Sequence, residues 1–127
     1  MTNKILIIDD EESVRDSFEL ALEPMDYEII TAIDGESGVI SAVANQPQLI
    51  FLDLKMPGID GVETLRQMRA AGVESPVYIV TAFMPDYLSN LSVAAKEGLR
   101  FGLGQKPLSS EQIRLIVKGM LETRDVN

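Results

Sequence analysis

The sequence predicts an α/β fold in which a parallel sheet of five strands is covered by helices on both faces. Short apolar runs rich in branched residues recur along the chain, and segments with helical spacing lie between them. Such runs are typical of strands buried on both faces of a parallel sheet. They lie near residues 4–8, 28–32, 49–53, 77–81 and 99–104. Their alternation with helices favours right-handed crossovers, which place helices on both faces of one sheet.

Each predicted helix follows a strand and carries an apolar stripe. The stripes are Val14, Phe18 and Ala21 after Ser13; Val39, Ile40, Ala42 and Val43 after Asp34-Gly35; Val62, Leu65 and Met68; Leu88, Leu91 and Ala95; and Ile113, Ile116, Val117 and Met120. Asp60 is a good N-cap for the third helix, with Glu63 at the capping-box position. Ser109 and Gln112 form the same pattern at the start of the fifth.

The composition indicates one globular domain, and we expect it to span residues 1–127 with no output domain. The chain has 127 residues, of which 46% are hydrophobic. It contains no run of about 18 apolar residues, so no membrane insertion is expected. The first residues, Met1 to Lys4, lead straight into a strand and do not resemble a secretory signal. We therefore expect a cytoplasmic protein.

Charge and missing residue types exclude several kinds of chemistry. The formal net charge of −9 argues against direct nucleic-acid binding, which needs a basic face. The chain has no cysteine, which excludes disulfides, thiolate nucleophiles and zinc-thiolate sites. It also has no histidine, so it cannot use an imidazole base. Any histidine chemistry has to come from a partner.

Polar residues follow the apolar runs where the predicted strands end. Asp9 and Asp10 follow the first run, and Asp53 ends the third. Thr81 ends the fourth run, and Lys106 follows the fifth. In an open parallel sheet the working site lies outside the carboxyl ends of the strands. Three carboxylates, one hydroxyl and one ammonium group would then meet at one edge, a set that suits a divalent cation and a phosphoryl group.

The order of these motifs resembles the receiver domain of two-component response regulators, in its CheY-like, single-domain form. The matching segments are Asp9-Asp10, Leu52 to Gly61, Thr81-Ala82 and Lys106-Pro107, and the resemblance covers the whole chain. It implies a flavodoxin-like, doubly wound (βα)5 sandwich of three layers, with strand order 2-1-3-4-5. It also implies a phosphorylation switch in signal transduction. Such a switch is not an enzyme, although it assists its own phosphotransfer and dephosphorylation.

The resemblance implies a magnesium site among the carboxylates. Asp10, Asp53 and the backbone carbonyl of Lys55 would bind Mg²⁺ directly, and Mn²⁺ could substitute. Asp9 would bind mostly through water. Three carboxylates about 5 Å apart repel one another by roughly 3 kcal/mol per pair at an effective dielectric constant near 20. A hard cation and the ammonium group of Lys106 would relieve that repulsion.

The same resemblance assigns the phosphoryl chemistry. Asp53 would be the phosphoacceptor and would attack a phosphohistidine on a sensor histidine kinase or a histidine phosphotransfer protein. Lys106 and Mg²⁺ would neutralise charge on the transferring oxygens, and Thr81 would hydrogen-bond one of them. Lys55 and Phe83 would flank the site entrance. There they would exclude the attacking water and lengthen the lifetime of the phosphoryl group.

The switch position departs from the family pattern. Receivers usually carry Tyr or Phe three residues before the lysine, where this chain has Leu103; the nearest aromatic residue is Phe101. A bulge near Gly102 or Gly104 could bring Phe101 into that place, since glycine permits backbone kinks. We favour Leu103, which needs no irregularity. The output would be a protein–protein contact with an unknown target, through the fourth helix, fifth strand and fifth helix.

Other functions fit the sequence less well. A phosphatase of the haloacid-dehalogenase type needs a second aspartate two residues after the nucleophile, where this chain has Lys55. A nucleotide- or flavin-binding protein needs a Gly-rich loop after the first strand, where Asp9 to Glu12 would repel phosphate. The alternatives that stay open are a phosphorylation-independent pseudo-receiver, and a receiver fragment of a larger regulator or hybrid histidine kinase.

Overall fold

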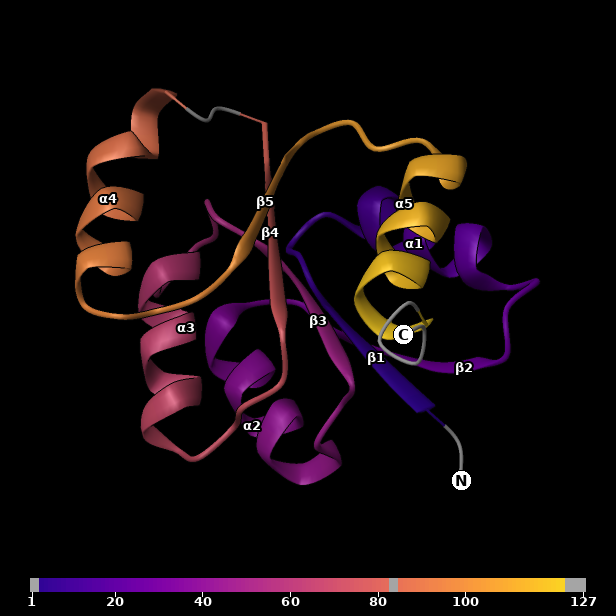
Figure 1. The fold of residues 1–127 in the computed structure, drawn as a ribbon, viewed down its shortest axis with the longest axis horizontal. Coiled ribbons are helices and arrows are strands. Elements are labelled where there is room, and N and C mark those ends of the chain that lie inside the picture. Colours follow the sequence, from indigo (N-terminus) through magenta and orange to yellow (C-terminus); the bar gives the residue numbers. More distant parts are fainter. Residues whose placement is uncertain (1–2, 83–84, 123–127) are drawn as a thin grey trace.

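The computed structural model describes residues 3–82 and 85–122, and in this part of the chain five parallel strands form one sheet between two helical layers (Figure 1). The strands are β1 (Asn3–Ile8), β2 (Tyr27–Ala32), β3 (Leu49–Asp53), β4 (Val77–Thr81) and β5 (Gly102–Gln105). Their order in the sheet is β2-β1-β3-β4-β5. The structure therefore confirms the predicted α/β fold and strand order.

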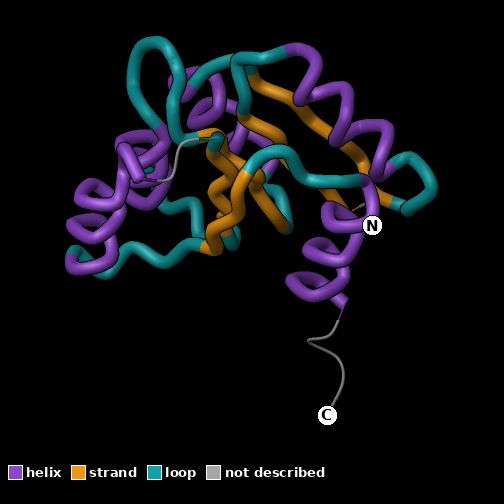
Figure 2. Tube along the Cα trace, turned by 90° about the horizontal axis from the view of Figure 1, so that it is seen from above, coloured by secondary structure: helices purple, strands orange, loops and turns teal. Residues whose placement is uncertain are grey.

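The helices lie on both faces of this sheet. They are α1 (Glu12–Leu22), α2 (Gly35–Asn45), α3 (Gly61–Ala70), α4 (Leu88–Lys96) and α5 (Ser110–Val117), with a 3₁₀ helix η1 (Pro85–Tyr87) before α4 and a π-helical turn η2 (Lys118–Glu122) after α5. Helices α1 and α5 cover one face, and α2, α3 and α4 cover the other (Figures 1 and 2). Within the described ranges, no helix is long and apolar enough to cross a membrane.

The inner strands build two hydrophobic cores because successive side chains point to opposite faces of the sheet. From β1, Ile5 and Ile7 pack with α1 and α5, whereas Leu6 and Ile8 pack with α2, α3 and α4. All five residues of β3 are buried. The inner strands are thus held from both sides, and the points at which they end are fixed by packing.

Helix α2 packs through its glycines and not through the whole predicted stripe. A Cβ atom on Gly38 would lie 2.6 Å from the side chain of Ile8, so only glycine allows the helix to come this close to β1. Because the glycine side faces the sheet, Ile40 is 71% exposed and Val43 is also exposed. The prediction that both residues lie on the buried face was wrong.

Helix α4 is attached by a narrow contact. Its buried residues are Leu91 and Ala94, whereas Leu88 is 57% exposed and Ala95 is also exposed. The predicted stripe was wrong at its two ends, because the helix presents the i, i+3 pair to the core and not the i, i+4 pair. Its N-cap residue, Tyr87, makes no side-chain capping hydrogen bond.

Strand β5 begins at Gly102, three residues later than predicted. From Gly102 to Gln105, each residue of β5 pairs with one residue of β4. Cβ atoms on Gly102 and Gly104 would lie 2.5 Å and 2.8 Å from the ring of Tyr78. The two glycines therefore let that ring cover the strand. No bulge interrupts the four paired residues of β5.

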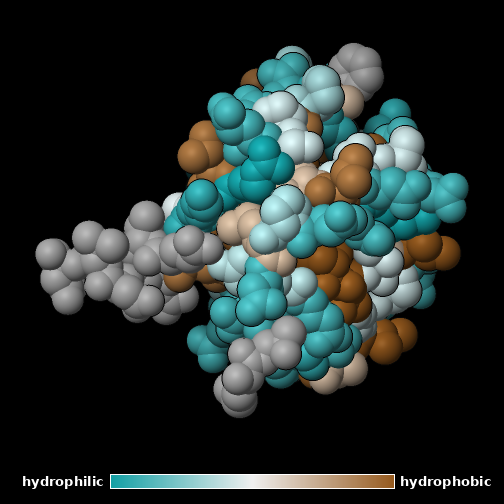
Figure 3. Space-filling view, turned by 90° about the vertical axis from the view of Figure 1, so that its right-hand side faces the viewer, coloured by the Kyte–Doolittle hydropathy of each residue, from teal (hydrophilic) through white to brown (hydrophobic). Residues whose placement is uncertain are grey.

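Strand β2 forms the other edge of the sheet, opposite β5, and most of it is not buried. Of its six residues, only Ala32 is buried. On the side of the molecule seen in Figure 3, apolar side chains occur in separate groups among hydrophilic ones. This edge contrasts with β1 and β3, whose ends carry the polar residues singled out by the sequence.

Two predicted helix caps differ in detail. Ser109 and Gln112 form the complete capping box at the start of α5, with reciprocal bonds between side chains and backbone. The carboxylate of Asp60 caps α3 by accepting the N–H of Glu63 at 2.9 Å. The Glu63 carboxylate does not return to Asp60 as a capping box requires. It instead accepts from the side chains of Arg66 and Gln67, which lie three and four residues further along the same helix face.

Candidate functional site

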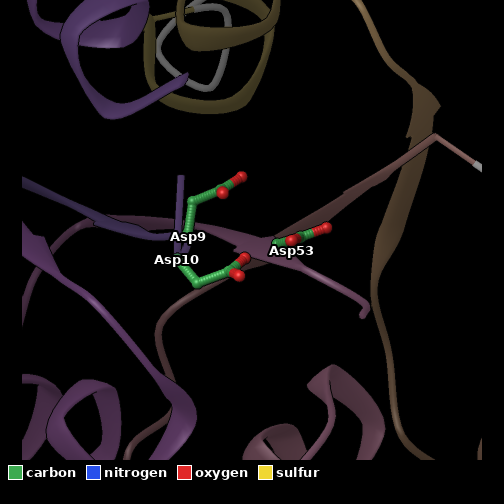
Figure 4. A group of neighbouring side chains, drawn as sticks. All are labelled: Asp9, Asp10 and Asp53. Carbon is green, nitrogen blue, oxygen red and sulfur yellow. The ribbon is translucent and has the colours of Figure 1, made fainter. Parts of the chain in front are cut away.

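The ends of β1 and β3 bring three carboxylates together, as the sequence predicts. Asp9 and Asp10 follow β1, and Asp53 is the last residue of β3. Each offers one carboxylate oxygen, and these atoms lie within 4.8 Å of one another. Figure 4 shows the three side chains gathered beyond the ends of the two strands. Asp9 and Asp53 are 3% and 5% exposed while Asp10 is exposed, so the cluster opens to solvent on one side.

The segment after β3 is fixed close to Asp53 by a glycine. A Cβ atom on Gly61 would lie 2.5 Å from the carbonyl oxygen of Asp53 and 2.9 Å from the Cα of Leu54. Glycine therefore lets α3 begin directly against the end of the strand. The N–H of Gly61 donates to the carbonyl of Leu54 at 2.8 Å, which closes the loop that contains Lys55.

Lys106 reaches the carboxylates from the end of β5. Its backbone N–H donates to the carbonyl of Thr81 at 2.9 Å and continues the pairing of the two strands. Its Nζ lies 2.8 Å from Oδ2 of Asp9 and 3.4 Å from Oδ1 of Asp53. A third carboxylate oxygen, Oε1 of Glu11, lies 3.5 Å from the same Nζ. One mostly buried ammonium group is thus shared among three acids.

Asp9 is held more firmly than its partners. Its carboxylate Oδ1 accepts the backbone N–H of Glu11 at 2.9 Å, and its carbonyl accepts from the guanidinium of Arg15 at 2.7 Å. Its own N–H donates to the carbonyl of Ala32 at 3.1 Å. With both backbone groups and one carboxylate oxygen occupied, Asp9 is a fixed anchor for Lys106.

Burial changes the acidity of Asp53. Burial, the first cause, and then the charge of Asp9 raise the pKa of Asp53 from 3.8 to about 6, although Lys106 opposes this rise. Burial acts to lower the pKa of Lys106, but its hydrogen bond to Asp9 and the neighbouring carboxylates outweigh burial and raise it. The carboxylates at this site therefore carry more negative charge than the single ammonium group of Lys106 balances.

A cavity of about 180 Å³ opens beside Asp53. Its lining residues are Glu11, Asp53, Lys55, Thr81, Ala82, Tyr87 and Lys106. Thr81 is almost fully buried. The cavity joins the carboxylate cluster to the end of β4, so a group attached to Asp53 would meet Thr81 and Lys106 there.

The structure brings together most of the residues that the sequence singled out. Asp9, Asp10 and Asp53 form one cluster, and Lys106 contacts two of them. Lys55 and Thr81 line the adjoining cavity. Leu103 and Phe101 are not among its lining residues, and Phe83 lies outside the described residues.

Two residues of the site were missed by sequence reasoning. Glu11 follows the aspartate pair directly, and its nearness to the site was predictable from that position. Tyr87 lies six residues after Thr81, beyond a loop, and its approach to the cavity depends on how α4 docks. No local pattern in the sequence indicates this approach.

The residues present fit a hard divalent cation. Three carboxylates with ligand atoms within 4.8 Å offer the oxygen donors that Mg²⁺ prefers. Burial and then the charge of Asp9 raise the pKa of Asp53, and the negative charge of the neighbouring carboxylates favours the same ion. The exposed position of Asp10 leaves an open side at which a cation could keep its waters.

Comparison with known proteins identifies the family. The family model described as the response regulator receiver domain matches residues 5–118. This chain therefore belongs to the response regulator receiver domain family. Such domains interact with histidine kinases or phosphotransfer proteins and bind Mg²⁺ at an acidic pocket; they are not conventional enzymes.

Individual relatives agree with this assignment. The alkaline phosphatase synthesis transcriptional regulatory protein PhoP of Bacillus subtilis is 33% identical over 99% of this chain and 51% of its own length. The chain thus spans about half the length of the curated relatives it matches.

Solved structures share the fold. A CheY-like response regulator receiver domain from Methanospirillum hungatei superposes with a TM-score of 0.86 at 24% identity, covering 98% of both chains. The N-terminal domain of a response regulator/sensory box/GGDEF protein from Carboxydothermus hydrogenoformans gives 0.82 at 25% identity, also covering 98% of both chains.

Proposed function

We propose that this chain is a phosphorylation switch in which Asp53 accepts a phosphoryl group from a phosphohistidine on a partner protein. The observation that carries the proposal is the placement of Asp53. It is buried among Asp9 and Asp10, its Oδ1 lies 3.4 Å from Nζ of Lys106, and a cavity opens beside it. A nucleophile, a compensating cation and space for a phosphoryl group thus coincide.

The transfer would proceed by attack of a carboxylate oxygen of Asp53 on the phosphorus atom. A new O–P bond forms while the P–N bond of the phosphohistidine breaks, and the electron pair of that bond stays on the ring nitrogen. The imidazole leaves as the neutral ring when its other nitrogen carries a proton, and otherwise takes one proton from water. Asp53 has to be ionised to attack. With the pKa of Asp53 at about 6 even without a metal ion, most of it is ionised at pH 7.

The other residues of the site have separate roles in the proposal. Lys106 is already 2.8 Å from Asp9 and can follow negative charge from Asp53 to the new phosphoryl oxygens, because its ammonium is a compact charge on a flexible stem. Thr81 would donate its hydroxyl to one of those oxygens. Asp10, Asp53 and the carbonyl of Lys55 would hold Mg²⁺, with Asp9 acting through water. Bound Mg²⁺ would supply further charge neutralisation.

Two flanking positions would set how long the phosphoryl group persists. Lys55 lines the cavity. Phe83, which lies outside the described residues, would flank the site entrance by resemblance to the family. A long lysine and a bulky aromatic side chain can exclude or misplace an attacking water, and such reactions are sensitive to misplacement of about 1 Å. We therefore propose slow self-hydrolysis and a long-lived phosphorylated state.

The proposal extends to the setting of the domain. The phosphoryl donor would be a sensor histidine kinase or a histidine phosphotransfer protein in the cytoplasm, and residues 1–127 would act as its receiver domain. Its signal would leave through protein contacts at α4, β5 and α5. Leu103 would take the place of the usual aromatic switch residue in β5. The alternative, Phe101, would need a bulge near Gly102 or Gly104, and the four paired residues of β5 contain none.

A second candidate function, a phosphorylation-independent interaction module, is less well supported. Such a module has no need for Asp9, Asp53 and Lys106 in mutual contact, yet here they are buried together. Covalent addition of a phosphoryl group to Asp53 distinguishes the two functions.

The proposal is tested by incubating the protein with acetyl phosphate and Mg²⁺ and measuring its mass. We expect one added phosphoryl group on the wild type, none on Asp53→Asn, and one on the control Asp16→Asn, whose carboxylate is exposed on α1. Equal labelling of Asp53→Asn and wild type, or no labelling of the wild type, contradicts the proposal.

A further inference from the structure

We propose that Tyr87 is the aromatic residue that couples phosphorylation of this chain to α4, by donating its phenol hydroxyl to the phosphoryl group on Asp53. This inference rests on the proposed function and adds a residue that sequence reasoning did not find. Tyr87 ends η1 and is the N-cap residue of α4. It therefore stands at the junction between the site and the helix.

Tyr87 lies in the wall of the proposed phosphorylation site. Tyr87 lines the same cavity of about 180 Å³ as Asp53, Thr81 and Lys106. Neither Leu103 nor Phe101 lines that cavity, and Leu103 is 37% exposed on β5. Among the described residues, Tyr87 is the one aromatic side chain in the cavity wall.

The electrostatic surroundings of Tyr87 keep its phenol protonated. Burial, the largest cause, and the charges of Asp60, Asp86 and Asp53 raise the pKa of Tyr87. The phenol thus lies within electrostatic reach of Asp53 and keeps its proton at neutral pH. A protonated phenol is a hydrogen-bond donor, and donors to charged acceptors form the stronger class of hydrogen bonds.

The phenol hydroxyl of Tyr87 can turn toward a new charge without losing a hydrogen bond to the described part of the chain. No hydrogen bond of the Tyr87 side chain to residues 3–82 or 85–122 is found, and its ring packs only partly buried against the core on the α2, α3 and α4 side. Phosphorylation brings about 1.5 to 2 negative charges into the cavity. The hydroxyl therefore gives up no bond to a described residue when it turns to this charge.

Helix α4 is packed loosely enough to respond to a movement of Tyr87. This helix has only Leu91 and Ala94 buried, and its N-terminus has no side-chain cap. A helix held by so small a contact can shift when its N-cap residue moves. Tyr87 would therefore convert a new charge at Asp53 into a displacement of the first turn of α4, where Leu88 is exposed.

The test uses beryllofluoride with Mg²⁺ as the phosphoryl mimic and compares the wild type with Tyr87→Phe, Tyr87→Leu and the control Tyr78→Phe. Tyr87→Phe keeps the ring and removes only the hydroxyl, so it is expected to fold. Tyr78→Phe removes a hydroxyl from a ring that packs on β5, away from the cavity. Affinity is measured by titration, and the response of α4 by the amide ¹H–¹⁵N shifts of residues 88–96.

We expect Tyr87→Phe to bind beryllofluoride about tenfold more weakly than wild type, the loss typical of one hydrogen bond to a charged group. Tyr87→Leu should show no shift of the α4 amides at saturation, and Tyr78→Phe should behave as wild type. Wild-type affinity in Tyr87→Phe, or a full α4 response in Tyr87→Leu, overturns the inference. A wild-type protein that binds no beryllofluoride refutes the proposed function itself, so the two failures are distinguishable.

Discussion

The inner strands and the region of α4 and β5 are built in different ways. Every residue of β3 is buried, as are four of the six residues of β1 and four of the five of β4, with cores on both faces. In β5 no residue is fully buried, and α4 buries two residues. Both regions border the same cavity or its entrance, one through Asp53 and the other through Tyr87.

This difference places the phosphorylation chemistry and the transmission of the signal in different parts of the molecule. Asp9 and Asp53 have to keep their geometry, and they extend from strands that are packed on both sides. Transmission of the signal requires a structural element to change position. Helix α4 can do so at a small cost in free energy, because few buried contacts restrain it. Buried area is therefore concentrated where positions must be kept and is small where a change must be transmitted.

The largest effect is expected from a matched pair of leucines. Leu52→Ala removes a fully buried side chain from β3, which should lower the free energy of unfolding by about 3–4 kcal/mol. Leu88→Ala removes an exposed side chain from α4 and should change it by less than about 0.5 kcal/mol. Urea unfolding of both variants measures the contrast, and similar losses would contradict it.

Magnesium should stabilise the inner-strand region. At 100 times its dissociation constant, Mg²⁺ bound only to the folded protein adds about 2.7 kcal/mol to the free energy of unfolding. Asp10→Ala should remove this dependence, whereas Asp16→Ala on α1 should keep it. Thermal unfolding with Mg²⁺ and with a chelator is the measurement. Equal Mg²⁺ stabilisation of Asp10→Ala and wild type rules out the assigned ligand.

Without metal, the stability of the protein should fall as pH rises through the titration of Asp53. The folded pKa of Asp53 is about 6, and an unfolded aspartate has a pKa of about 3.9. The folded state therefore binds more protons between about pH 4 and 6, and the stability that this group contributes below pH 4 is lost above pH 6.

Asp53→Asn cannot titrate at this position. In chelator at pH 7 it should be more stable than wild type by about 1–3 kcal/mol. The difference should shrink as pH falls toward 4. A difference that stays constant from pH 4 to 7 would show that Asp53 does not titrate in this range.

The smallest effect concerns the tie between α3 and α4. Nε of Arg66 on α3 lies 2.8 Å from Oε1 of Glu97, just after α4, and both side chains are partly exposed. Surface ion pairs of this kind contribute about 0.2–1 kcal/mol. Glu97→Gln should therefore cost less than about 1 kcal/mol at low salt and almost nothing at high salt. A double-mutant cycle with Arg66→Gln measures the coupling, and a value well above 1 kcal/mol would mean that α4 is held firmly.

The sequence predicts the inner strands better than the region of α4 and β5, for a physical reason. Continuous apolar runs define where β1, β3 and β4 end, so Asp9, Asp53 and Thr81 could be placed at one edge from the sequence alone. On α4, choosing Ala95 in place of Ala94 turns the expected face by about 100°. The close approach of α2 through Gly38 and the position of Tyr87 depend on tertiary packing, which no local pattern records.

Native-state hydrogen exchange of the metal-free protein tests most directly whether α4 opens separately from the firmly packed inner strands. The amides of Ile50, Phe51 and Leu52 in β3 should exchange only through global unfolding, with the full free energy of unfolding. The amides of Leu91 to Ala94 in α4 should exchange through a local opening that costs clearly less free energy and depends weakly on denaturant. If the α4 amides instead require the same free energy and the same denaturant dependence as those of β3, α4 is not a separately mobile element and the account is wrong.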